Sequence, residues 1–488
     1  GPVQFPISIK SPLNAESAFG LAAMLLIALR SVRGPGAKSR RFDGADALIC
    51  CGIAVFIVAV FARTAGWYFL SDDFILIKYA AQATHNLKPT FTTAGGDGFY
   101  RPLVYASFAW SRLGVNPVEW HAVGIAIHLL NSILVFWLGL ELRLSRFAAG
   151  MGAALFAVHA TRPEVVVWVT GRFDLLATLF VLLTLVCFLR GGWLRVIAFP
   201  AMVLGLISKE SAYAAPVALL VLMVASGDWK GKRALAYLPF FGAAAAVFAY
   251  RWSLFHGIGG YLTAAGTPQA LSLHAVTVIK ALMLRVWAIL FFPINWAIQP
   301  GIWLGVATIF YLAAVGALTL ARADRRSAAV LAALMGAFLL PVIPVMLIGA
   351  DLEKARYLYL PSAAFCLLLA MVADGSRWRW PIVCAIFVFQ LAALWHNLAP
   401  WKAGAEMSRA ACETIAREPA RRIAVVGVPG YEDGVQVFAN GLKECVDLEN
   451  PRHGALTIVL NDPTPPAGGD YDRVFVWDEA SRALKRIN

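Results

Sequence analysis

Two adjacent carboxylates end an aromatic and apolar run in the segment WYFLSDDF, which leads from Trp67 to Asp72, Asp73 and Phe74. A positioned carboxylate can act as a general base that takes the proton from an attacking hydroxyl group. Adjacent side chains on a helix do not share a face. We therefore expect one of the two aspartates to point into a site and the other to cap the following helix, with Ser71 as a rival cap.

Further charged residues stand at the ends of apolar segments, in GGDGFYRPL, HATRPEVVVWVTGRFD, SKES and EKARYLYLP. Taken singly, each cation could reach the membrane surface or pair with a nearby acid. The candidate pairs are Arg172 with Asp174, Lys209 with Glu210, and Lys354 with Glu353. As a set, these segments bring cations and carboxylates to one depth of a membrane. Cations at that depth would neutralise the phosphate of an amphiphilic substrate, and a phosphate leaving group needs no general acid.

The composition indicates a membrane protein with several spans. The chain has 488 residues, of which 60% are hydrophobic and 15% charged, and its mean hydropathy is +0.68. These values are too apolar for a soluble globular chain. Although the net charge is +13, most Lys and Arg residues lie in short loops between apolar runs, as the positive-inside rule predicts. This placement argues against nucleic acid as a partner.

About eleven apolar segments are candidate membrane spans, since about 20 residues cross a bilayer core. They are residues 45–66, 118–142, 147–160, 173–190, 194–208, 211–226, 234–252, 299–321, 328–348, 362–373 and 381–396. If they alternate, the basic clusters share the cytoplasmic side, and the loop 67–117 and the C-terminus lie outside. The apolar stretch 276–292 contains Lys280 and Arg285, which favour an interfacial or re-entrant helix. Residues 17–29 are short for a span.

Three regions follow from this pattern. Residues 1–44 form a cytoplasmic or interfacial segment whose Gly1-Pro2 start is typical of a cleaved tag, and we expect the first span to be an uncleaved anchor. Residues 45–396 form an all-α transmembrane domain, with interfacial helices in the loop 67–117. Residues 397–488, the C-terminal module, predict a small α/β fold with strands at 422–429, 455–461 and 473–477 and helices at 402–418 and 435–446. Its Cys412 and Cys445 could pair if the module lies outside.

The order of five motifs resembles the GT-C glycosyltransferases. These motifs are SDDF, YRPL, HATRPEVVVWVTGRFDLL, SKE and EKARYLYLPS, between about Trp67 and Trp401. Within that superfamily, the chain looks most like bacterial relatives of the transmembrane, TPR-containing O-mannosyltransferases. It is more distantly similar to protein O-mannosyltransferases and to the aminoarabinose transferase of lipid A. Five motifs in one order are more specific than any one of them.

The resemblance implies an inverting glycosyltransferase that uses a polyprenyl-phosphate sugar on the periplasmic face of the bacterial inner membrane. The first acid of the pair, Asp72, would be the general base, with Asp73 as the fallback. Charge and depth assign the donor phosphate to four cations, which are Arg101, Arg172, Lys209 and Arg356. Candidate sugar or acceptor contacts are Asp97, His159, Arg162, Glu164, Glu210 and Tyr357.

The chain departs from these relatives in two respects. It ends in the C-terminal module instead of TPR repeats, so the resemblance does not extend to a protein acceptor. Relatives often have H-P-x-x-x-E where this chain has the residues from His159 to Glu164, including Arg162. No clustered metal-ligand spacing occurs, so we expect no required metal and no cofactor besides the lipid-linked sugar. The expected partners are that donor, a glycan, glycolipid or protein acceptor, and membrane lipids.

Three other functions are compatible with parts of the sequence. A transporter or flippase of lipid-linked sugars would favour repeated halves and polar residues near the membrane midplane, and neither is evident. An O-antigen ligase or polymerase usually has its large outer loop late in the chain, whereas here the long loop comes first. An assembly protein without chemistry would make Asp72 and Asp73 ordinary helix caps. The sequence does not specify the sugar, the polyprenol length, the acceptor or the oligomeric state.

Overall fold

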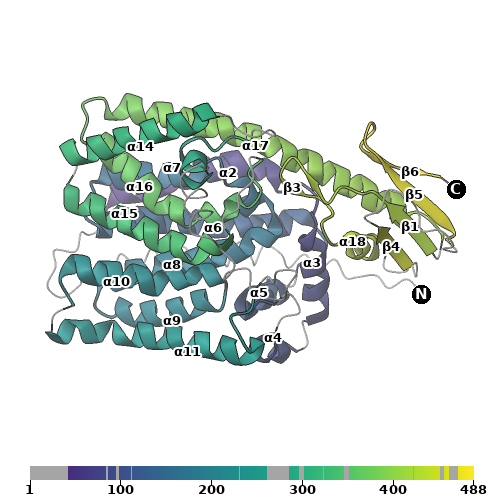
Figure 1. The fold of residues 1–488 in the computed structure, drawn as a ribbon, viewed down its shortest axis with the longest axis horizontal. Helices are drawn as coiled ribbons and strands as arrows, with labels where there is room; N and C mark the ends of the chain where they lie inside the picture. The colour runs from purple at the N-terminus through teal and green to yellow at the C-terminus, as the bar shows by residue number, and fades with distance from the viewer. Residues whose placement is uncertain are drawn as a thin grey trace.

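The chain folds into a helical bundle with a small sheet at one end (Figure 1). The computed structural model describes residues 42–83, 86–94, 98–111, 113–229, 231–260, 285–295, 302–322, 324–345, 351–420, 422–450, 456–460 and 471–487. Asp97, the stretch 17–29 and Lys280 fall outside these ranges, so the predictions made for them stay predictions.

Each of the predicted spans overlaps a helix of the bundle. These helices are α2 (Gly44–Phe61), α6 (Pro117–Glu141), α7 (Arg146–Val158), α8 (Arg172–Arg190), α9 (Leu194–Leu206), α10 (Ala214–Ser226), α11 (Leu238–Phe255), α14 (Ile302–Arg322), α15 (Arg325–Leu339), α16 (Pro361–Asp374) and α17 (Arg379–Ala416). Within the described residues, 6 helical segments are long and apolar enough to cross a membrane, and the other apolar helices are shorter. The protein is therefore a helical membrane protein, and the count of about eleven spans stays a prediction.

The starts of several helices follow from local capping. The Asp43 side chain accepts hydrogen bonds from the backbone N–H groups of Ala45 and Asp46, and the Asp46 side chain accepts one from the Asp43 N–H. Ser145 caps α7 in the same way, through a 3.0 Å bond from the Ala148 N–H. These caps satisfy N–H groups that have no partner within a helix.

Glycines let the central helices approach closely. A Cβ atom on Gly139 of α6 would lie 2.9 Å from the Cβ of Ala149 on α7 and 2.9 Å from Leu367 on α16. A Cβ on Gly152 of α7 would lie 2.8 Å from the same leucine. Small residues at these crossings therefore permit backbone contact, which is how helices associate in lipid.

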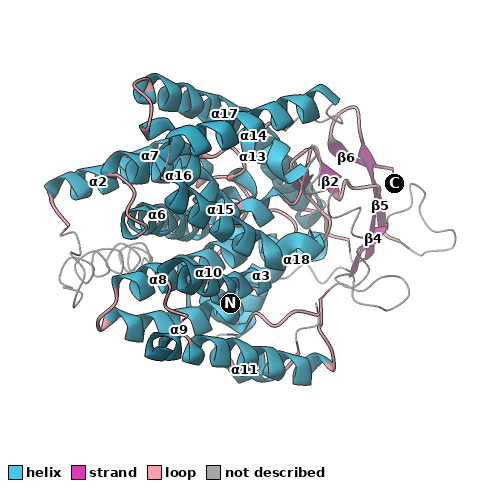
Figure 2. Cartoon of the chain, turned by 60° about the vertical axis from the view of Figure 1, so that its left-hand side comes forward, coloured by secondary structure: helices cyan, strands magenta, loops and turns pink. Residues whose placement is uncertain are grey.

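The predicted first outer loop forms short helices at the sheet end of the bundle. They are α3 (Asp72–Ala83), α4 (Lys88–Thr92) and α5 (Pro102–Ser111). Both views place α3 next to the C-terminal module (Figures 1 and 2). Of the stretch 276–292, the structure describes residues 285–292, where α13 (Trp287–Phe291) buries Ile289 and Leu290. The interfacial or re-entrant placement of this segment stays a prediction.

The C-terminal module begins inside a continuous helix. Helix α17 extends from Arg379 to Ala416, so the predicted boundary at 396/397 falls within it, and the helix expected at 402–418 is its last part. The sheet has the order β4-β1-β5-β6, formed by β4 (Leu456–Leu460), β1 (Arg422–Val426), β5 (Arg473–Asp478) and β6 (Ala483–Arg486). Strand β1 is parallel to both β4 and β5. Its nearly continuous apolar sequence is typical of a buried central strand.

One helix of the module is shorter than predicted. We expected a helix over 435–446, but α18 (Leu442–Glu449) begins later. Val435 and Gln436 form strand β3, which pairs with β2 (Tyr431–Glu432). Gly441 has a φ of +85°, a left-handed conformation that interrupts a right-handed helix. The short loop between β3 and α18 is therefore left to contact the bundle.

A disulfide joins the end of α17 to α18, between Cys412 and Cys445. We expect the double variant Cys412→Ser/Cys445→Ser to lose about 2–4 kcal/mol of the module's stability, because the cross-link restricts the unfolded chain. Limited proteolysis should then cleave the C-terminal module at lower protease concentration than in the wild type. Equal resistance of the two proteins would contradict this expectation.

Candidate active site

Asp73, the fallback candidate for the base, is buried at the start of α3. Its Oδ1 accepts hydrogen bonds from the Thr170 N–H at 2.8 Å and the Thr170 hydroxyl at 2.7 Å, and its Oδ2 accepts one from the Leu70 N–H at 3.1 Å. Burial raises the pKa of the Asp73 carboxyl to about 7, against the opposing effect of the hydrogen bonds from Thr170 and Leu70. The carboxyl thus joins the start of α3 to the turn before α8.

Asp72 is partly exposed and points toward the C-terminal module. Its Oδ1 accepts a 2.8 Å hydrogen bond from the Asn440 side-chain amide. The hydroxyl of Ser71, the rival cap, accepts the Asn440 backbone N–H at 3.1 Å and so also contacts the module. Of the two acids, only Asp72 is open to a substrate. The structure thus separates their environments, while the catalytic assignment stays a prediction.

We expect Asp73→Asn to destabilise the protein by about 1–3 kcal/mol. Both carboxyl oxygens accept a backbone N–H group, so an amide must turn its NH₂ group toward one of these donors. Thermal unfolding of the purified variant in detergent would measure the loss. Thr170→Val removes only the hydroxyl donor and should cost less. An Asp73→Asn variant with wild-type stability would show that these bonds do not hold α3.

Arg101 and Glu210 form one ion pair at the outer-loop end of the bundle. The Arg101 Nε and Nη2 donate to one Glu210 oxygen at 2.9 and 2.6 Å. Arg251 of α11 donates to the other Glu210 oxygen at 2.9 Å. The Arg101 guanidinium also lies over the rings of Phe99 and Phe173. A single carboxylate thus holds two arginines from different elements.

Two more pairs lie around Tyr357. Lys209 donates to both oxygens of Asp174 at 2.6 Å, and Arg356 pairs with Glu164. The Lys209 ammonium and the Arg356 guanidinium lie 5.1 and 5.2 Å from the centre of the Tyr357 ring. Burial lowers the pKa of Lys209 to about 8, an effect that the carboxylate of Asp174 opposes.

These residues define a charged cluster, which consists of Arg101, Glu164, Asp174, Lys209, Glu210, Arg251 and Arg356. The positive charges of Arg101 and Arg356 both lower the pKa of Lys209, so the pairs lie within electrostatic range of one another. The structure therefore brings together charges that are far apart in the sequence. Phosphate binding by the three predicted cations among them stays a prediction.

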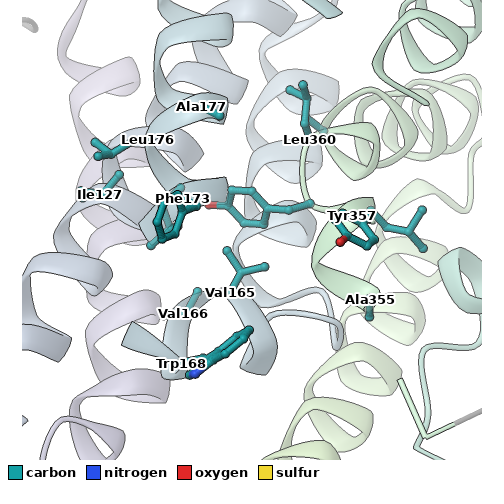
Figure 3. Close-up of a cluster of buried hydrophobic side chains, with 14 of the residues drawn as sticks. Ile127, Val165, Val166, Trp168, Phe173, Leu176, Ala177, Ala355, Tyr357 and Leu360 are labelled. Atoms are coloured by element: carbon teal, nitrogen blue, oxygen red, sulfur yellow. The ribbon is translucent and has the colours of Figure 1, made fainter. Parts of the chain in front are cut away.

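Trp168 connects the charged cluster to the start of α3. The Arg356 guanidinium lies 5.0 Å from the centre of its ring, and its indole N–H donates to the Leu70 carbonyl at 3.3 Å. Figure 3 shows Trp168, Phe173 and Tyr357 around Val165 in a buried apolar cluster. Apolar packing thus excludes water on one side of the charges, which strengthens their interactions.

Three predicted site residues lie in the interior with protein partners. Arg172 donates to the Ser111 hydroxyl at 3.1 Å and lies over the ring of Phe108. Arg162 donates to the Phe156 carbonyl and the Ser362 hydroxyl. His159 contacts the Leu290 carbonyl and the Thr161 hydroxyl. The substrate contacts that the sequence predicts for these three residues stay predictions.

The pairing expected from sequence was only partly correct. Lys354 pairs with Glu353 at 3.1 Å, as predicted. The expected pairs of Lys209 with Glu210 and of Arg172 with Asp174 were wrong. Lys209 forms its ion pair with Asp174, and Glu210 forms ion pairs with two arginines. Neighbours in sequence point in different directions at these turns, and the fold supplies other partners.

Two contacts of the site were not predicted from the sequence, that of Arg251 with Glu210 and that of Asn440 with Asp72. Arg251 lies within a predicted span, where a buried cation is a signal for a polar partner. Asn440 carried no such signal, because an asparagine before a glycine usually indicates a turn. Among the described residues, no three His, Cys, Asp or Glu side chains gather as a metal site. The expectation that no metal is required remains a prediction.

Fold and site together describe a helical membrane protein with a charged cluster and an open carboxylate at one end. Protein O-mannosyl-transferase Tmtc2 of Drosophila melanogaster is 31% identical over 157 residues, which is 29% of this chain and 16% of that protein. Protein O-mannosyl-transferase Tmtc1 of the same organism is 34% identical over 99 residues, 20% of this chain and 12% of the relative.

Human protein O-mannosyl-transferase TMTC4 is 38% identical over 101 residues, 17% of this chain and 14% of that protein. No protein-family model matches the chain. The matched part therefore covers less than one fifth of each of these relatives. This similarity supports a relation to O-mannosyl-transferases over a limited segment.

Proposed function

We propose that the protein is an inverting GT-C-type glycosyltransferase that moves a sugar from a polyprenyl-phosphate carrier to an acceptor hydroxyl. The observation that carries this proposal is the partly exposed carboxylate of Asp72 at the start of α3. Trp168 joins the backbone just before it, at Leu70, to Arg356 of the charged cluster. The partial similarity to proteins named O-mannosyl-transferases supports it and makes mannose the first sugar to test.

In the proposed reaction, Asp72 takes the proton of the acceptor hydroxyl as its oxygen attacks the anomeric carbon. The bond from that carbon to the phosphate oxygen breaks, the configuration inverts, and polyprenyl phosphate leaves with the bonding electrons. Arg101, Lys209 and Arg356 would stabilise the charge on the leaving phosphate. Their carboxylate partners hold these cations in place before the donor binds.

We place the reaction on the periplasmic face of a bacterial inner membrane. Helix α3 of the loop 67–117 lies against α18 of the C-terminal module at one end of the bundle (Figure 1), so we assign both to the same side. The disulfide between Cys412 and Cys445 supports an oxidising compartment on that side. The acceptor is a glycan, a glycolipid or a protein.

The test is release of polyprenyl phosphate by the purified protein in nanodiscs. A panel of polyprenyl-phosphate sugars, starting with mannose, would be mixed with a membrane glycolipid extract as the acceptor source. Appearance of polyprenyl phosphate together with a glycosylated acceptor supports the proposal. Movement of the intact lipid-linked sugar across a bilayer without cleavage would replace it with a transporter function.

A further inference from the structure

The C-terminal module contacts the residues next to the candidate base. The Ser71 N–H donates to the Val437 carbonyl at 3.0 Å, and Ser71 has a φ of +45°, which is rare for a residue with a side chain. A Cβ atom on Gly441 would lie 2.2 Å from the Ser71 carbonyl oxygen. The loop before α18 thus lies directly against the turn that starts α3, and only a glycine fits there.

A second set of contacts holds the module along α3. Lys78 pairs with Asp447 of α18 at 2.7 Å, and the Tyr68 hydroxyl donates to Glu449. The Arg409 guanidinium lies 5.2 Å from the centre of the Tyr68 ring. The Lys78 pair joins α18 to α3, which carries Asp72, and the Tyr68 contacts join the module to the segment before α3. All of them lie away from the carboxylate itself.

We propose that Asn440 is a positioning residue for Asp72, and this inference rests on the proposed function. Its amide donates to Oδ1 of Asp72 at 2.8 Å, while its backbone N–H is held by the Ser71 hydroxyl. The amide therefore restricts rotation of the carboxylate and leaves Oδ2 to accept the proton of the acceptor hydroxyl. The C-terminal module is thus part of the active site and not only a stabilising domain.

The geometry explains why a hydrogen-bond donor is needed beside the Asp72 carboxylate. A free aspartate side chain rotates about its terminal torsion, so its oxygens are not fixed. Holding a catalytic group in the reactive orientation can contribute a large part of a rate enhancement. A neutral amide orients the carboxylate without an opposite charge that would form a direct ion pair with the base.

The test compares Asn440→Leu, Asn440→Asp and Lys78→Met in the full-length protein in nanodiscs. We expect Asn440→Leu, which keeps the size but not the donor, to lower kcat on the order of 10-fold with little change in KM for the lipid donor. Asn440→Asp places a like charge against Asp72 and should lower kcat on the order of 100-fold. Lys78→Met removes a docking contact away from the carboxylate and should keep kcat.

Several results would overturn this inference. Wild-type kcat in Asn440→Leu would exclude a positioning role, and so would an equal loss of kcat in Lys78→Met. A fall in unfolding temperature that matches the loss of kcat in both Asn440 variants would assign Asn440 a structural role only. If Asp72→Asn is inactive while both Asn440 variants are fully active, the proposed function stands and this inference fails. If Asp72→Asn is fully active, the assignment of the base itself is wrong.

Discussion

The variant Asp72→Asn is expected to fold normally and to lose nearly all release of polyprenyl phosphate. Loss of a general base typically lowers the rate on the order of 10²–10⁴-fold. The fold should survive because Asp72 is partly exposed and its one described hydrogen bond is accepted by Oδ1, which an asparagine retains. Donor binding should also survive, since the proposed phosphate contacts are in the charged cluster.

Three measurements on Asp72→Asn separate catalysis from stability. Polyprenyl-phosphate release reports chemistry, binding of a labelled donor reports the phosphate site, and thermal unfolding reports the fold. Glu406→Gln is a matched control, because it neutralises an exposed carboxylate, 69% accessible, on α17. A folded Asp72→Asn variant that releases polyprenyl phosphate at the wild-type rate would reject Asp72 as the base.

Lys209→Met is expected to destabilise the protein by about 3–5 kcal/mol, because it leaves the buried Asp174 carboxylate without its partner. Lys209 and Asp174 are both nearly inaccessible, with 8% and 6% of their side chains exposed. The double variant Lys209→Met/Asp174→Leu removes both charges and should recover most of the lost stability. Thermal unfolding in detergent would measure the stability of the wild type, of Lys209→Met and of the double variant.

The same double variant also tests the phosphate site. Although its fold recovers, it lacks the Lys209 cation, so we expect weaker binding of the polyprenyl-phosphate donor. Lys402→Met provides the control, since its pair with Glu406 is exposed and should change stability by less than about 0.5 kcal/mol. Wild-type stability of Lys209→Met would show that the buried pair does not hold the site together. Full donor affinity in the double variant would remove Lys209 from the phosphate site.

The sequence was sufficient for the order of helices and for most of the sheet in the C-terminal module. Long apolar segments predict helices directly, because a chain in lipid must satisfy its backbone hydrogen bonds within each segment. Strands β1, β4 and β5 also lie where the apolar runs predicted them. The start of α18 was missed because Gly441 takes a left-handed conformation that propensity does not specify.

For the candidate site, residue types and spacing by themselves determined which segments carry polar groups at the ends of apolar runs, namely SDDF, YRPL, HATRPEVVVWVTGRFD, SKES and EKARYLYLP. Only the tertiary structure decided how these groups pair, since Asp174 of α8 finds its partner Lys209 in the turn between α9 and α10. It also decided that Asp73 is buried while Asp72 stays open, and that Asn440 reaches Asp72 across 368 positions. Contacts over such separations depend on how the helices and the module pack. The local pattern of residues in a sequence does not specify that packing.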